Sequence, residues 1–260
     1  MINTAFEYLN FLLKSKLKHG VHSPLVYNLV EDVLLDKRKF HAFDVIEGAR
    51  KNLLINKNEL SVTDYGAGSK KQKNKKRVVG DIAKNATVPV KYGKLLFRLA
   101  NFYKPKVLLE LGTSLGIGTS YIASGKNRDA ILTTVEGDEG IFNISQQVQK
   151  ALKLENVVGI NSQFDNFLEE YIDQNPVIDF VYVDGNHTQE ATLKYFNLLK
   201  SQMSDNGLII FDDIYWSDGM KKAWSVIKND NAISSTVDLF KFGLVYFRKK
   251  HAKENFYIRF

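Results

Sequence analysis

The chain has 260 residues, of which 44% are hydrophobic and 25% are charged, a composition typical of a globular protein with a sizeable core. It contains no cysteine, which excludes a disulfide scaffold, a thiolate zinc site, an iron–sulfur cluster and a cysteine nucleophile. Lysine and arginine outnumber aspartate and glutamate by 36 to 29, and the resulting charge of +7 allows anionic partners without requiring them.

Residues 1–88 predict an N-terminal cap of helices. Apolar residues recur at helical spacing over residues 3–19, and residues 25–35 and 42–54 are expected to form two further helices. No stretch approaches 18 apolar residues, and the first residues lack the features of a secretory signal. We therefore expect a cytoplasmic protein that does not span a membrane.

Residues 64–77 differ from the rest of the cap. Gly66 and Gly68 precede a run in which six of the eight residues 70–77 are basic. Because no helical or strand period is visible there, the segment is expected to be an exposed, mobile loop. Two interpretations of this loop remain open, a solvated surface segment without a role and a flexible lid at the mouth of an active site.

From residue 106 short apolar runs alternate with amphipathic helical stretches. This alternation predicts an α/β fold, in which helices cover both faces of a parallel sheet. Two β-rich runs at 235–240 and 244–248 flank Lys241-Phe242-Gly243 and predict a hairpin, so that the sheet ends in an antiparallel pair. The α/β domain is expected over residues 89–260. Its predicted parallel strands are 107–111, 131–136, 157–160, 179–183 and 207–211.

A glycine-rich segment, Glu110–Thr119, follows the first of these strands and opens a helix. Glycines let a ligand approach the main chain closely, and a helix N-terminus favours an anionic group. A dinucleotide fingerprint would need a third glycine where Tyr121 stands, and the Gly-Lys-Ser/Thr sequence of a P-loop is absent. The carboxylate of Glu110 would repel a pyrophosphate, but it suits a ligand that carries an ammonium group.

Glu136 ends the second strand, 24 residues after Gly112. An acidic residue at this place can accept hydrogen bonds from ribose hydroxyls. The glycines alone would also fit a tight strand–helix turn that binds nothing. With Glu110 and Glu136 at this spacing, a ligand site is the favoured interpretation.

The sequence Glu-x-Gly-x-x-x-Gly-x-Gly, followed by Glu136, resembles motifs I and II of the class I S-adenosylmethionine-dependent methyltransferases, over roughly residues 90–250. The resemblance implies a Rossmann-like, doubly wound sheet of seven strands in the order 3-2-1-4-5-7-6, with the last strand antiparallel, and S-adenosylmethionine as cofactor. It implies that Glu110 and the Gly112–Gly116 loop hold the methionine end of the cofactor and that Glu136 holds the ribose. Phe164 and Asp165 would lie beside the adenine. The implied cofactor-binding residues are Glu110, Gly112, Thr113, Ser114, Gly116, Glu136, Gly137, Phe164, Asp165 and Asp184.

Carboxylates follow the fourth and fifth predicted strands. Asp184 comes directly after the fourth, and Asp212 and Asp213 come after the fifth. Clustered carboxylates repel one another unless a cation or protons lie among them, and Mg²⁺ accepts a few carboxylates while keeping positions for substrate oxygens. Such an ion would lower the pKa of a bound hydroxyl. The alternative interpretation is that the aspartates only cap helices and order loops.

The Asp-Gly-x-His sequence that ends at His187 and the Asp-Asp pair resemble an O-methyltransferase-like branch of these enzymes. The resemblance implies that Asp184, Asp212 and Asp213 bind a divalent metal ion. His187 is the candidate general base, with Asp184 as the second catalytic residue, because a histidine titrates close to neutral pH. His187 could equally orient an aspartate or open the following helix.

Together these features predict methyl transfer from S-adenosylmethionine to a hydroxyl group of a small molecule, with possible assistance from Mg²⁺. An RNA- or protein-directed methyltransferase and a catalytically inactive S-adenosylmethionine-binding module are the alternatives. A nucleic-acid partner is less favoured, because the basic run at 70–77 contains no interleaved aromatic residues.

Overall fold

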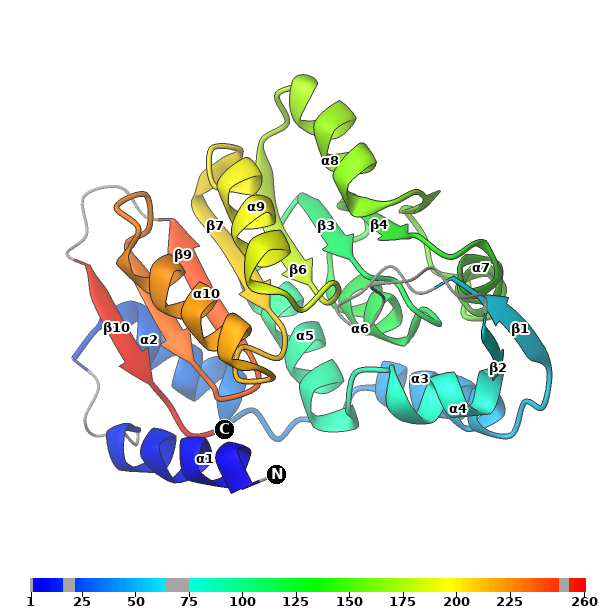
Figure 1. The fold of residues 1–260 in the computed structure, drawn as a ribbon, viewed down its shortest axis with the longest axis horizontal. Helices are drawn as coiled ribbons and strands as arrows, with labels where there is room; N and C mark the ends of the chain where they lie inside the picture. Colours follow the sequence, from blue (N-terminus) through cyan, green and yellow to red (C-terminus); the bar gives the residue numbers. More distant parts are fainter. Residues whose placement is uncertain (1, 16–21, 64–74, 248–252) are drawn as a thin grey trace. The chain divides into compact units, whose positions relative to one another are not determined.

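The computed structural model describes residues 2–15, 22–63, 75–247 and 253–260 (Figure 1). Within this part of the chain the fold is α/β, with a mostly parallel sheet of eight strands and a separate pair of antiparallel strands. The α/β class predicted from the alternation of strands and helices is confirmed.

Contacts group the chain into two compact units. The first unit consists of residues 36–167, and the second unit consists of residues 1–35 together with residues 168–260. The sequence places the end of a helical cap at residue 88 instead, and that division stays a prediction.

The first unit holds three neighbouring parallel strands. Its elements are α3 (His41–Leu54), β1 (Glu59–Val62), β2 (Lys75–Val78), α4 (Val79–Asn85), α5 (Val90–Tyr103), β3 (Val107–Leu111), α6 (Ile117–Gly125), β4 (Ile131–Glu136), α7 (Glu139–Ala151), β5 (Val157–Asn161) and α8 (Phe164–Asp173), which continues into the second unit. The strand order is β3-β4-β5. The register pairs Leu111 with Val135, so the residues that follow, Gly112 and Glu136, come side by side at the carboxyl edge.

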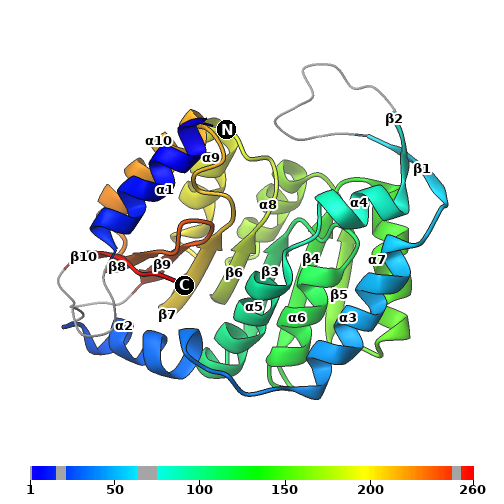
Figure 2. The same ribbon diagram turned by 90° about the horizontal axis from the view of Figure 1, so that it is seen from below.

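The second unit holds the other strands of the large sheet. Its elements are α1 (Ile2–Lys14), α2 (Pro24–Asn28), a π-helical segment (Leu29–Leu34), β6 (Ile178–Val183), α9 (Gln189–Leu199), β7 (Met203–Phe211), α10 (Asp218–Asn229), β8 (Ser235–Asp238), β9 (Gly243–Phe247) and β10 (Glu254–Tyr257). The strand order is β10-β8-β9-β7-β6. Figure 2 shows α9 and α10 on one face of these strands and α2 on the other, which leaves their central part buried from both sides.

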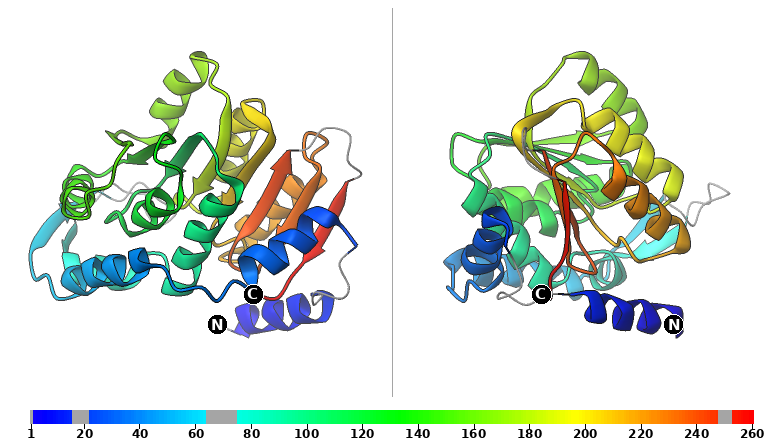
Figure 3. Two further views of the ribbon diagram at one scale, coloured as in Figure 1. Left: turned by 180° about the vertical axis from the view of Figure 1, so that it is seen from behind. Right: turned by 90° about the vertical axis from the view of Figure 1, so that its left-hand side faces the viewer.

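The strand order agrees with the one that the resemblance to the class I methyltransferases implies. Counted from β3 onward, it is 3-2-1 in the first unit and 4-5-7-6 in the second. As predicted, the strands β8 and β9 form an antiparallel hairpin, and β9 is also antiparallel to β7. The Rossmann-like class is therefore confirmed, but the described residues contain an eighth strand, β10, which pairs in parallel with β8 at the edge of the sheet (Figure 3).

The apolar composition of β6 and β7 follows from their burial. Phe180, Val181, Ile209 and Ile210 have no exposed surface. Strands covered on both faces lack the alternation of apolar and polar residues that marks a half-exposed strand. This explains why the sequence shows them as continuous apolar runs.

The predicted loop at 64–77 needs a correction at its end. Lys75–Val78 is the strand β2, which pairs antiparallel with β1, and Lys76 lies 3.6 Å from the carboxylate of Glu59. The strand forms through main-chain pairing with β1, and its run of charged residues lacks the alternation of apolar and polar residues from which a strand is predicted. Residues 64–74 lie outside the described part of the chain, so the interpretation of the basic loop as a lid stays a prediction.

The predicted N-terminal helix over residues 3–19 is present as α1 up to Lys14, and residues 16–19 lie outside the described part. The second predicted helix, 25–35, is α2 followed by the π-helical segment. None of the described helices is long and apolar enough to cross a lipid bilayer.

A substitution at Gly125 tests how closely α6 packs on α5. A Cβ atom on this residue would lie 2.3 Å from the carbonyl oxygen of Phe97. Because main-chain atoms must move to relieve this overlap, Gly125→Ala should lower the free energy of unfolding by about 1–3 kcal/mol. Denaturation in urea measures the change.

The matched control is Gly48→Ala in α3, where the added Cβ would meet nothing within 4 Å. This change should be neutral or stabilise the helix by up to about 1 kcal/mol. Equal effects of the two substitutions would contradict the close approach at Gly125.

Candidate functional site

The main chain between β3 and α6 forms a tight loop. Gly112, Ser114 and Gly116 have φ angles of 108°, 47° and 83°. Glycine adopts such angles freely, whereas the left-handed conformation costs a residue with a side chain about 1–2 kcal/mol. A Cβ atom on Gly116 would also lie 3.3 Å from Cβ of Ser145 in α7. The glycine spacing in the sequence thus corresponds to a loop that requires glycine at two of its positions.

Glu136, at the end of β4, holds this loop through its carboxylate. Oε2 accepts a hydrogen bond from the amide of Ser114 at 2.9 Å, and Oε1 accepts one from the amide of Asp138 at 3.0 Å. Burial raises the pKa of Glu136 above its usual value, although these backbone amides act in the opposite direction. A carboxylate has about four acceptor positions, so Glu136 can accept further hydrogen bonds from a ligand.

Glu110 lies in the interior of the first unit, with no exposed surface. Its Oε2 accepts hydrogen bonds from the hydroxyls of Thr119 in α6, at 2.5 Å, and Thr134 in β4, at 2.6 Å. The hydroxyls of Thr113 and Thr134 are 2.6 Å apart. The carboxylate therefore joins two strands and the helix that frame the glycine loop, and its predicted contact with a ligand ammonium group stays a prediction.

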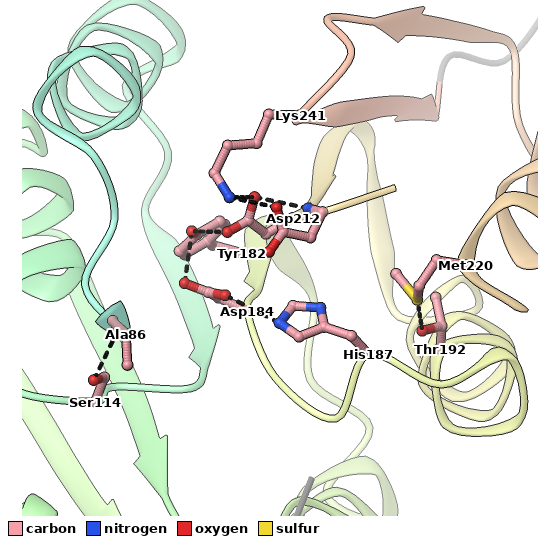
Figure 4. A network of polar contacts seen from close by, with 10 residues as sticks. Ala86, Ser114, Tyr182, Asp184, His187, Thr192, Asp212, Met220 and Lys241 are labelled. Atoms are coloured by element: carbon pink, nitrogen blue, oxygen red, sulfur yellow. Dashed lines mark hydrogen bonds and ion pairs between the residues drawn. The ribbon is translucent and has the colours of Figure 1, made fainter. Parts of the chain in front are cut away.

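Two further contacts tie earlier parts of the first unit to this region. Asp138 caps α7 by accepting from the amide of Ile141, and its other oxygen accepts from the amide of Thr63 at 2.7 Å. The hydroxyl of Ser114 donates to the carbonyl oxygen of Ala86 at 3.1 Å (Figure 4). The segments at 63 and 86 therefore border the loop, which the sequence did not predict.

The remaining predicted cofactor residues of the first unit lie at the ends of its strands. Gly137 follows β4 directly, while Phe164 and Asp165, both half-buried, open α8 after β5. Their predicted roles beside the cofactor stay predictions.

The second unit brings the predicted acidic residues together at the ends of β6 and β7. The parallel register pairs Val183 with Phe211, so Asp184 and Asp212 follow side by side. The hydroxyl of Tyr182 lies 2.9 Å from Oδ2 of Asp184 and 3.4 Å from Oδ2 of Asp212 (Figure 4). Strand pairing therefore makes neighbours of two carboxylates that are far apart in the sequence.

Lys241 supplies a positive charge to this cluster. Its Nζ lies 2.9 Å from Oδ1 of Asp212 and 2.5 Å from Oδ1 of Asp213. Burial and the charges of Asp184 and Asp213 raise the pKa of Asp212 well above its usual value, against the opposing effect of Lys241. Burial lowers the pKa of Lys241, but the two aspartates outweigh it and raise the pKa of this lysine above its usual value.

The predicted metal role of Asp184, Asp212 and Asp213 does not fit this arrangement. Among the described residues, no three histidine, aspartate or glutamate side chains are grouped so that they could hold a metal ion. The ammonium group of Lys241 already contacts two of the three predicted ligands. The binding of Mg²⁺ inferred from the sequence is therefore not supported.

His187 faces Asp184 from the loop that leads to α9. Its Nε2 lies 3.5 Å from Oδ1 of Asp184, and the two side chains are 24% and 22% exposed. Burial raises the pKa of Asp184, but the hydrogen bond and charge of His187, with smaller effects of Lys241 and Tyr182, hold it below its usual value. The partly exposed pair can thus orient the imidazole ring and leave it accessible to a substrate.

Several residues of these two groups were missed in the sequence. Thr119, Thr134 and Lys241 carry no local signal, because their partners come from other elements. Tyr182 lies two residues before its partner Asp184, but a tyrosine in a strand does not indicate such a contact. Asp138 could have been found, since an aspartate before an amphipathic helix is a common N-cap.

The part of the chain that includes the glycine loop, Glu136, Asp184 and the Asp212-Asp213 pair matches a known family. Residues 109–214 match the family model described as a methyltransferase domain. This stretch runs from β3, with its glycine loop, to the residues that follow β7. None of the curated protein sequences matches the chain.

Solved structures with a similar fold include three methyltransferases. An O-methyltransferase from Bacillus cereus in complex with S-adenosylhomocysteine (SAH) has a TM-score of 0.57 and 18% identity, covering 86% of this chain and 97% of its own. The O-methyltransferase TomG from Streptomyces achromogenes, in complex with S-adenosylmethionine, has a TM-score of 0.58 and 15% identity, covering 86% and 95%. The SAH-bound methyltransferase PaMTH1 from Podospora anserina has a TM-score of 0.61 and 15% identity, covering 91% and 99%.

The family model and these structures agree with the resemblance drawn from the motifs. Residues 109–214 match a methyltransferase domain, and the solved structures share the fold of the chain, as the resemblance to the class I enzymes implies.

The hydrogen bond from Thr119 to Glu110 allows a test of whether this buried carboxylate stabilises the elements around the glycine loop. Thr119→Val keeps the shape of the side chain but removes a donor to a fully buried carboxylate, so it should lower the free energy of unfolding by about 1–3 kcal/mol. Thr192→Val is the matched control, because this buried hydroxyl donates to the uncharged sulfur of Met220 (Figure 4). If urea denaturation shows equal losses for both variants, the carboxylate does not depend on Thr119.

Proposed function

We propose that the protein transfers a methyl group from S-adenosylmethionine to a hydroxyl group of a small-molecule acceptor. The observation that carries the proposal is the contact between Glu136 and the amide of Ser114, which joins the glycine loop to an acidic strand end. The match of residues 109–214 to a methyltransferase domain supports it. Solved structures of similar fold that contain S-adenosylmethionine or SAH support the choice of cofactor.

In this proposal most of the cofactor-binding residues lie at the ends of β3, β4 and β5, and Asp184 follows β6. The main chain of the Gly112–Gly116 loop and the carboxylate of Glu110 hold the methionine end. Glu136 accepts hydrogen bonds from the ribose hydroxyls, which its remaining acceptor positions allow. The assigned cofactor-binding residues are Glu110, Gly112, Thr113, Ser114, Gly116, Glu136, Gly137, Phe164, Asp165 and Asp184.

The bound cofactor supplies an electrophilic methyl group on a sulfonium ion. In the transfer, the bond from this methyl group to the acceptor oxygen forms, the bond to sulfur breaks, and the hydroxyl proton leaves to a base. We assign the base to His187. Since Nε2 faces Asp184, Nδ1 is the nitrogen that receives the proton, and the carboxylate stabilises the imidazolium that results.

Cofactor binding can be tested without an acceptor. Isothermal titration calorimetry with S-adenosylmethionine and SAH should show binding to the wild-type protein, and Glu136→Ala should weaken it at least about tenfold, the loss of one charge-assisted hydrogen bond. Glu139→Ala, an exposed acidic neighbour, is the control and should bind as the wild type does. Absence of binding to the wild-type protein would overturn the proposal.

The role of His187 is tested once an acceptor is found. Incubation with methyl-labelled S-adenosylmethionine and separate pools of hydroxylated small molecules, RNA and protein identifies the acceptor class. His187→Gln should then lower kcat by about 10²–10⁴-fold and leave the affinity for SAH within about twofold. His41→Gln, an exposed residue of α3, should change neither value. A kcat close to that of the wild type would exclude His187 as the base, and labelling of RNA or protein alone would contradict the small-molecule acceptor.

A further inference from the structure

We infer that Lys241 takes the place of a divalent cation between Asp212 and Asp213, so that this acidic cluster works without a metal ion. Its Nζ lies 2.9 Å and 2.5 Å from one oxygen of each aspartate. Lys241 is then a positioning residue, because it fixes carboxylates and does not itself donate or accept the transferred group. Only its relevance to catalysis rests on the proposed function.

The position of Lys241 is fixed by the main chain as well as by its side chain. The antiparallel register pairs Phe211, the last residue of β7, with Gly243, the first residue of β9. The turn before β9 therefore lies at the carboxyl end of β7. The amide of Ile214 donates to the carbonyl oxygen of Lys241 at 3.3 Å, which keeps this turn beside the Asp212-Asp213 pair.

The residue beside Lys241 anchors the turn in the core. Phe242 has no exposed surface, and its ring centroid lies 5.6 Å from that of Tyr182. Tyr182 in turn contacts Asp184 and Asp212 through its hydroxyl. The same strand ends therefore hold both the lysine and the acidic residues that it neutralises, so the ammonium group is a built-in part of the cluster.

The oxygens of Asp212 are already occupied in a way that disfavours a metal ion. Oδ1 accepts from Lys241 at 2.9 Å and from the amide of Asp213 at 2.7 Å, which uses both of its lone pairs. Mg²⁺ would need carboxylate oxygens at about 2.0–2.1 Å in a near-octahedral arrangement. A divalent ion at this place would also be repelled by the ammonium group. Removal of the lysine charge should therefore open a metal site.

This consequence can be measured with Mn²⁺, a paramagnetic ion that also prefers oxygen ligands. Electron paramagnetic resonance of the free ion reports binding without S-adenosylmethionine or an acceptor. The wild-type protein should bind no Mn²⁺ at this cluster, whereas Lys241→Gln should bind one ion at least about tenfold more tightly than any site of the wild type. Thermal unfolding should agree, with Mn²⁺ raising the midpoint of the variant and not that of the wild type.

Two controls separate this effect from a general loss of a lysine. Lys200→Gln removes a half-buried lysine that pairs with a single carboxylate, Asp230, at 2.8 Å, and it should not create a metal site. The double variant Lys241→Gln/Asp212→Asn should lose the site that the single variant gains. Gain of Mn²⁺ binding in Lys241→Gln alone supports the inference.

Two other results would overturn the inference about Lys241. One-to-one Mn²⁺ binding by the wild type that is lost in Asp212→Asn would show that the cluster is a metal site in spite of Lys241. A folded Lys241→Gln variant without gained binding would show that the lysine does not occupy a cation position.

If Lys241→Gln does not fold, the charge-balanced variant Lys241→Gln/Asp213→Asn shows whether the lysine is needed for its charge or for packing. Recovery of folding without Mn²⁺ binding supports charge replacement, and failure to fold shows instead that Lys241 is needed for packing. A failure of S-adenosylmethionine binding would remove the proposed function but would leave these metal measurements valid.

Discussion

The hydrogen bond from the amide of Ser114 to Glu136 is the contact on which the geometry of the glycine loop depends. Ser114 has a φ of 47°, a conformation that costs a residue with a side chain about 1–2 kcal/mol, and a hydrogen bond to a carboxylate contributes enough to offset this cost. The register of β3 and β4 sets the two residues beside each other. The loop thus keeps its shape through a group that is itself a ligand candidate, so the cofactor site would be preorganised.

In the acidic cluster of the second unit, as at Glu136, each buried carboxylate needs a hydrogen-bond donor or a cation beside it. Asp212 has 3% exposure and lies near two other aspartates. Isolated, such a charge would be unstable in the interior. Lys241 and Tyr182 meet this need from the ends of neighbouring strands, which leaves Asp184 to pair with His187 at the surface. The proposed base, His187, is thus held by Asp184 and is partly exposed, at 24%.

The strands and the positions of Glu110, Glu136 and Asp184 at their ends could be predicted because they depend on local patterns, whereas the strand order was implied by the family resemblance. Apolar runs locate the strands, and motif residues at strand ends follow from them. The strand β10 was missed, because four half-exposed or exposed residues carry little apolar signal and its pairing with β8 is non-local. Lys241 was read only as part of a hairpin turn, since nothing near it in the sequence shows that this turn ends beside β7.

The contact of Lys241 with Asp212 and Asp213 is the reason why this arrangement does not support the predicted metal site. An aspartate after one strand and an aspartate pair after the next produce the same sequence pattern whether a divalent ion or a lysine neutralises them. The side chain that decides between the two comes from the turn before β9, almost thirty residues further along the chain. The antiparallel strand order is what brings it there, because β9 begins where β7 ends. In sheets of this order, the residue two positions before the last antiparallel strand should therefore be examined together with the aspartates before a metal is assigned.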